Sequence, residues 1–245
     1  MRLYLPRKTA GEIQYATKHL CGSSAKLKCP LEGLLEQGTM GTLQTSGTRL
    51  VYSANITTGA LLLSESRTLA LLLLDDAKSR DLTQRALEDN LLQKRSPVTT
   101  KKMVTLIKSR FLYLTREDLE VVAHGDRAEA SLLLLAAIVQ AHRIVGDFCR
   151  YIGKECIGLY KTSVTPADWD AYYEQCCALQ PSVASWSGKT AQKVRAVVFR
   201  ILVECGLLQA DTLAILPLFV PQCVQAYLAK PEHAYARTCL EAFNE

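Results

Sequence analysis

The residue types in this chain that could bind a ligand by charge are lysines and arginines gathered in two stretches. From Asn90 to Arg116 seven residues are basic and none is acidic. From Gln175 to Val203 four are basic, again without an acid. Because these stretches carry +11 and the whole chain only +5, the remainder is net acidic. Such segregation of charge is typical of a protein that binds a polyanion.

The two stretches also share a pattern, because segments 96–102 and 187–193 both read S-x-x-T-x-x-K and lead into amphipathic helices. A hydroxyl before the first helical residue, free backbone N–H groups and nearby lysines form a favourable site for a phosphate group. We therefore expect the outward faces of both helices to bind nucleic-acid phosphates, with a solvated face that binds nothing as the alternative. The predicted contact residues are Lys94, Arg95, Lys101, Lys102, Lys108, Lys189, Lys193, Arg195 and Arg200.

The opposite faces of these helices are apolar and are expected to be buried. Arg110 projects to that side, between Leu106 and Leu114, so we expect it to form a structural ion pair rather than a nucleic-acid contact. The other residues predicted to be buried are Met103, Ile107, Val194, Val198, Ile201 and Cys205.

The sequence only partly determines which kind of nucleic acid the chain is expected to bind. Gln192 and Arg195 are the plausible base-reading residues near a helix start, so mostly phosphate contacts are expected. Single-stranded binding usually needs exposed aromatic side chains, and both stretches are poor in them. The sequence therefore favours duplex DNA, and RNA stays open.

Motifs of catalysis are missing. The chain has no G-x-S-x-G or H-E-x-x-H, and Gly188-Lys189-Thr190 ends like a P-loop but lacks its earlier glycine. None of the nine cysteines forms a C-x-x-C pair, and the metal-like spacing of His19, Cys21 and Cys29 has no fourth ligand. We expect no catalytic residues, no metal and no cofactor.

The elements that carry these residues are predicted to be helices. From Ile56 onward apolar residues recur every three or four positions, and the alternation of a strand is missing, which indicates an all-α fold of about nine helices. Thr165-Pro166 with Asp168 predicts a capped helix start. The expected helices are 61–74, 80–93, 97–113, 116–123, 127–150, 166–178, 189–205, 212–228 and 231–243.

The chain is expected to form two helical lobes, residues 51–155 and 156–245, joined by a hinge at 153–166. Residues 1–50 are rich in turn-forming residues and are predicted to be an arm or extension. The longest apolar run, Leu132 to Val139, is far shorter than the roughly 20 residues of a membrane span. With no secretory signal either, we expect a soluble cytoplasmic protein.

Several segments stand out in order along the chain. They are ITTGALLLSESR (56–67), NLLQKRSPVTTKK (90–102), IVQAHRIVGDF (138–148), and WSGKTAQK (186–193) leading to ECGLL (204–208). Together they resemble the BrxA family, a core component of BREX phage-exclusion systems. The resemblance covers about residues 52–210. It implies an all-helical fold with some likeness to the antitermination factor NusB, double-stranded DNA binding, and work beside other BREX proteins, among them a methyltransferase and an ATPase.

Two functions thus compete. In the first, the chain is a non-catalytic DNA-binding protein, a monomer when alone. In the second, it is a scaffold or adaptor that binds other BREX proteins without touching nucleic acid. Salt dependence separates them, because phosphate binding weakens steeply as salt rises.

Overall fold

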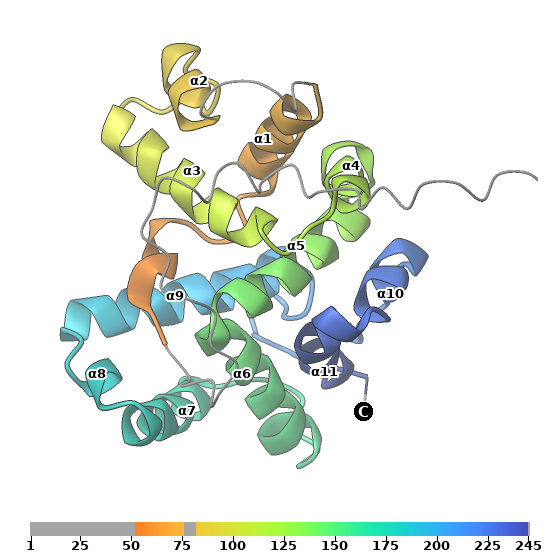
Figure 1. The fold of residues 1–245 in the computed structure, drawn as a ribbon. Helices are drawn as coiled ribbons and strands as arrows, with labels where there is room; N and C mark the ends of the chain where they lie inside the picture. Colours follow the sequence, from red (N-terminus) through yellow and green to blue (C-terminus); the bar gives the residue numbers. More distant parts are fainter. Residues whose placement is uncertain (1–51, 76–81, 245) are drawn as a thin grey trace, which may run out of the picture.

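The chain folds as an all-α protein, as the apolar spacing predicts (Figure 1). The computed structural model describes residues 52–75 and 82–244. Within these ranges no strand forms, and the only β-pairing is two isolated bridges, Ser163 with Ala214 and Leu208 with Ile215. The predicted arm and the metal-like spacing at residues 19–29 lie outside the described residues.

Eleven α-helices and three short 3-10 or π segments are described. In chain order they are η2 (Ala54–Thr58), α1 (Leu63–Asp75), α2 (Leu82–Glu88), α3 (Pro97–Phe111), α4 (Arg116–His124), α5 (Arg127–Ala141), α6 (Arg143–Tyr151), η3 (Ile152–Ile157), α7 (Pro166–Leu179), α8 (Pro181–Ala184), α9 (Gly188–Glu204), α10 (Gln222–Leu228), η4 (Pro231–His233) and α11 (Ala234–Glu241).

Helix α5 is the central element of the fold. Every residue from Ala130 to Val139 is buried, which is typical of a helix surrounded by others. It contacts α3, α4, α6, α10 and α11, and Figure 1 shows it in the middle of the bundle. Buried side chains before and after residue 155 belong to one cluster. The two predicted lobes therefore share a core.

The predicted helix 127–150 is wrong in one respect, because it is broken at His142. This residue has φ −132° and ψ 88°, and the axes on either side differ in direction by 108°. A straight helix of that length would extend about 36 Å, whereas the bend lets α6 bury Ile144, Val145 and Phe148 in the same core.

No single described helix is both long and apolar enough to cross a membrane. One bent pair, residues 127–141 with 143–157, meets that criterion jointly.

The predicted helix 212–228 is also wrong over its first half, since α10 begins only at Gln222. Pro217 and Pro221 interrupt the segment, and proline lacks the N–H that a helix interior needs. The backbone instead bonds to neighbouring segments: Ile215 N–H donates to the Thr162 carbonyl at 2.9 Å, and Leu216 N–H to the Leu207 carbonyl at 3.0 Å. The apolar spacing there reflects an extended segment packed on the core.

The predicted hinge at 153–166 begins as helix, because η3 is a π-helical continuation of α6. Gly153 allows α11 to approach closely, since a Cβ there would lie 2.6 Å from the Ala242 Cβ. The predicted start at Thr165 is confirmed, with a complete capping box to Asp168. The sequence interpretation missed the short segments η2 and α8.

Candidate nucleic-acid interface

Helices α3 and α9 carry the two basic stretches and flank η2, which contacts both of them. In Figure 1 both helices begin on the left of the molecule. They also begin in the same register: Pro97 and Gly188 are the first helical residues, so Lys102 and Lys193 both occupy the sixth position. The shared sequence pattern thus corresponds to two equivalent helix starts.

The orientation of both helices is as predicted. Every α3 side chain expected to be buried is buried, including Leu114 just beyond the helix. On α9, Val194, Val198 and Ile201 are buried, while Cys205 is only half-buried. The basic side therefore faces outward on each helix.

Five of the nine predicted contact residues are exposed and form no ion pair or side-chain hydrogen bond with any described residue. We refer to this set as the interface cations: Arg95, Lys101, Lys102, Lys189 and Lys193.

The other four already have partners. Three form ion pairs: Lys94 with Glu65 at 3.0 Å, Arg195 with Asp170 at 3.8 Å, and Arg200 with Glu204 at 2.7 Å. Lys108 is half-buried and also has an interaction partner. The interface cations thus gather at the starts of α3 and α9.

The two helix starts differ in how they are capped. Ser187 Oγ accepts a hydrogen bond from the Thr190 N–H at 3.2 Å, as the pattern predicts. Ser96 occupies the cap position of α3, but its side chain makes no capping hydrogen bond within the described chain. The first N–H groups of α3 therefore lack a hydroxyl acceptor and can donate to an external oxygen.

Arg110 is completely buried, as its position on the apolar side predicts. The prediction that it forms an ion pair is wrong. Its partners in the described ranges are backbone carbonyls: Nη1 donates to Leu61 at 2.9 Å, and Nη2 to Ala60 at 2.7 Å and Gly59 at 3.4 Å. Burial lowers the pKa of Arg110 to about 10, so the side chain stays charged near neutral pH. It fixes the segment that precedes α1.

A cleft of about 640 Å³ lies beside this segment. Its walls come from residues 58–65, Arg67, Met103, the start of α5, and Arg200 with Glu204 on α9. We call it the Arg127 cleft, after the α5 residue at its edge. Lys94 and Arg200 both line it, so the structure brings together one predicted contact residue from each basic stretch.

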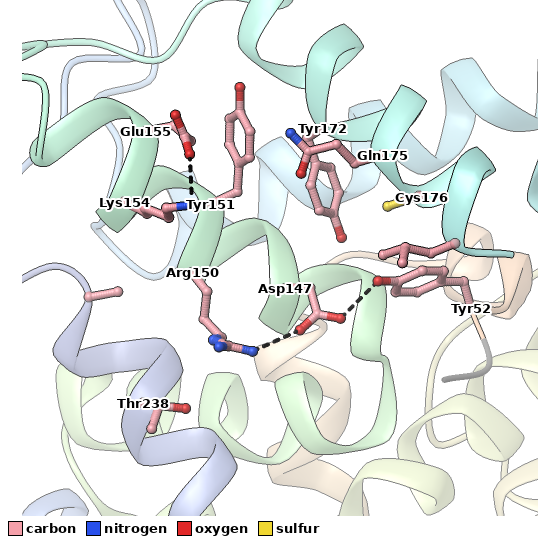
Figure 2. A pocket seen from close by; sticks show the side chains of 12 residues that line it. Tyr52, Asp147, Arg150, Tyr151, Lys154, Glu155, Tyr172, Gln175, Cys176 and Thr238 are labelled. Carbon is pink, nitrogen blue, oxygen red and sulfur yellow. Dashed lines mark hydrogen bonds and ion pairs between the residues drawn. The ribbon is translucent and has the colours of Figure 1, made fainter. Parts of the chain in front are cut away.

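A second hollow, the Asp147 pocket, has a volume of about 480 Å³ and lies between α6, α7 and α11 (Figure 2). Asp147 accepts hydrogen bonds from Tyr52 Oη at 3.0 Å and Tyr235 Oη at 2.8 Å, and pairs with Arg150 at 3.6 Å. The sequence interpretation missed this network, because its members are far apart in the chain.

The chemistry of the Asp147 pocket is that of a structural junction. Burial raises the pKa of the Cys176 thiol to about 11, so the nucleophilic thiolate is scarce near neutral pH. Burial, with Asp147 close by, also raises the pKa of Tyr52. The network ties the first described residue to α6 and α11. In the described part of the chain no group of three or more side chains has the arrangement of a metal site.

Fold and surface together define a class: an all-helical protein with exposed cations at the starts of two helices, α3 and α9. The family model for BrxA matches residues 51–232. The chain therefore belongs to the BrxA family.

Individual relatives agree with this membership. The BREX protein BrxA of Paramagnetospirillum magneticum is 31% identical over 192 residues, which cover 78% of this chain and 96% of the relative. The BREX protein BrxA of Bacillus cereus is 26% identical over 65% of this chain and 80% of its own length. A crystal structure of an uncharacterized protein from Magnetospirillum magneticum superposes with a TM-score of 0.69, with 28% identity, covering 78% of this chain and 98% of that one.

Proposed function

We propose that this BREX component is a non-catalytic protein that binds double-stranded DNA through the starts of α3 and α9. The observation that carries the proposal is the set of interface cations, which are exposed and unpaired within the described chain. Lysine and arginine contacts to phosphates supply most of the sequence-independent affinity for DNA. The unused N–H groups at the start of α3 add donors for a phosphate oxygen.

Duplex DNA is favoured over single strands by the placement of the aromatic residues in the basic stretches. Phe111 is fully buried, and Trp186 and Phe199 are half-buried against the core. Only Tyr113 is exposed, with 37% of its surface accessible. Such a surface provides little for base stacking, on which single-strand binding depends.

The scaffold function is the second candidate, and two exposed apolar residues favour it. Tyr160 is 94% and Phe219 86% exposed, and large exposed apolar side chains are enriched at protein interfaces. In this alternative the chain binds other BREX proteins and has no direct contact with nucleic acid.

The test is an electrophoretic mobility shift with purified protein and three probes of equal length: duplex DNA, single-stranded DNA and RNA duplex. We expect a shift of duplex DNA that weakens as salt rises from about 50 to 200 mM. A stronger shift of the single strand would contradict the duplex assignment. No shift of any probe at low salt would favour the scaffold.

A further inference from the structure

We infer that the Arg127 cleft is a binding site for a small phosphorylated molecule of about the size of a nucleoside monophosphate. The inference does not rest on the proposed DNA contacts, because none of the interface cations lines this cleft. Its basis is the convergence of four cations from separate elements on one hollow.

Cations in the cleft outnumber acids by four to two. Arg67 comes from α1, Lys94 from the turn before α3, Arg127 from α5 and Arg200 from α9, facing Glu65 and Glu204. The lining therefore carries a net charge of +2, which complements a phosphate monoester with its charge of about −2 near neutral pH.

Both acids are already occupied by the protein. Glu65 accepts from Lys94 Nζ at 3.0 Å. Glu204 accepts from Arg200 Nε at 2.7 Å and, through its other oxygen, from the Leu61 N–H at 2.9 Å. These contacts hold Lys94 and Arg200 in place while leaving further N–H donors on each for a ligand.

The other two cations lack an acidic partner in the described chain. Arg67 donates from Nη2 only to backbone carbonyls, Gly125 at 2.6 Å and Asp126 at 3.0 Å. Arg127 is exposed and has no partner among the described residues. It is also the first residue of α5, where a cation opposes the helix dipole. An anion beside Arg127 would relieve this unfavourable placement.

The acids nearest to Arg127 in sequence do not compete for it. Asp126 and Glu129 form a complete capping box at the start of α5, with hydrogen bonds of 2.8 and 3.0 Å. Neither lines the cleft. The guanidinium of Arg127 thus remains available for the two-point contact that arginine makes with phosphate oxygens.

Apolar side chains complete the site and indicate more than a bare phosphate ion. Leu62 and Leu63 are half-buried, and Met103 is 8% exposed, along the same wall. A volume of about 640 Å³ lies within the range of small-molecule pockets. A nucleoside monophosphate combines a phosphate with an apolar ring face and matches both parts of this lining.

The test is isothermal titration calorimetry in phosphate-free buffer with adenosine 5′-monophosphate, adenosine and inorganic phosphate. We expect the nucleotide to bind more tightly than either of its parts. Arg127→Gln should weaken nucleotide binding by about tenfold or more, without loss of fold, because this change removes an unfavourable charge from a helix start. Lys154→Gln removes an exposed cation of η3 that lines the Asp147 pocket and not this cleft, so it is the control and should bind as the wild type does.

A phosphate of the DNA backbone would offer the cleft the same chemistry, so a short duplex is added as a competitor. We expect duplex DNA not to displace the nucleotide, and Arg127→Gln to keep its duplex affinity. If duplex DNA displaces the nucleotide, and Arg127→Gln weakens duplex binding as much as it weakens nucleotide binding, the cleft is assigned to DNA and the inference is overturned. Absence of nucleotide binding at millimolar concentration, or unchanged binding by Arg127→Gln, would overturn it as well.

Discussion

Arg110 and Leu61 are joined by a 2.9 Å hydrogen bond from the buried guanidinium to the backbone carbonyl oxygen. The N–H of the same Leu61 donates to Glu204 on α9, also at 2.9 Å. Leu61 therefore connects α3 to α9, the two helices of the proposed interface. This connection adds to the packing of η2 against both helices.

Replacing Arg110 with methionine should strongly destabilise the protein. The change leaves the carbonyl oxygens of residues 59–61 buried without their donors, and we expect the free energy of unfolding to fall by roughly 3 kcal/mol or more. Urea denaturation measures it. The exposed Arg95→Met is the control, with an expected change below about 0.5 kcal/mol. Equal stabilities of the two variants would show that the Arg110 contacts are dispensable.

A second stability prediction concerns Asp168 at the start of α7. Burial alone would raise the pKa of this carboxyl, but hydrogen bonds from Lys161 at 2.6 Å and from Thr165 outweigh burial and lower it. A lowered pKa stabilises the fold above the unfolded value of about 3.9, and this contribution is lost as pH falls through the folded pKa. Asp168→Asn should therefore be less stable than the wild type at pH 7.

The difference between wild type and Asp168→Asn should shrink as the pH is lowered below 4. Chemical denaturation at pH 7, 5 and 3 follows it. A difference that stays constant down to pH 3 would mean that the carboxylate charge does not contribute.

His142, at the break between α5 and α6, gives a pH dependence of the same sign as Asp168 but at higher pH. Burial, together with the nearby charge of Arg110, lowers the pKa of its imidazole to about 4. Between about pH 6.5 and 4 the unfolded chain takes up a proton that the folded protein does not. The free energy of unfolding therefore decreases as the pH is lowered through this window. The loss between pH 7.5 and 5 should be about 2 kcal/mol.

His142→Gln should remove that part of the pH dependence. The comparison uses the change in unfolding free energy between pH 7.5 and 5 in each protein, because the substitution also shifts stability at every pH. The same change in both proteins would show that the ring is protonated as easily in the folded as in the unfolded state.

Some of this fold is readable from the sequence because it depends on neighbours along the chain. The start of α7 is an example: Thr165, Pro166 and Asp168 form the cap by themselves. The buried faces of α3 and α9 also follow from the spacing of apolar residues. The basic residues of these helices, apart from Arg110, do not fall on the buried faces, so they are expected on the outer faces.

Features set by tertiary contacts were not predictable in this way. Nothing in the apolar run before His142 marks a break, because the bend depends on how α6 fits the core. The partners of Arg110 are backbone carbonyls 49 to 51 residues away, and no side-chain pattern encodes them. The Arg127 cleft likewise gathers residues from separate elements, so its composition is visible only in the fold.

The salt dependence of duplex DNA binding tests the central claim most directly. The test variant changes to glutamine the four lysines among the interface cations: Lys101, Lys102, Lys189 and Lys193. The control variant changes to glutamine four solvent-accessible, ion-paired cations that are not among the predicted contact residues: Arg116, Arg150, Lys154 and Arg237.

Both variants have four fewer positive charges than the wild type, so the loss of net charge is the same in both and does not explain a difference between their slopes. We expect the slope of log affinity against log salt to fall in the test variant by about 0.9 for each phosphate that the protein no longer neutralises. In the control variant the slope should stay at the wild-type value. Equal slopes in all three proteins would contradict binding through the starts of α3 and α9.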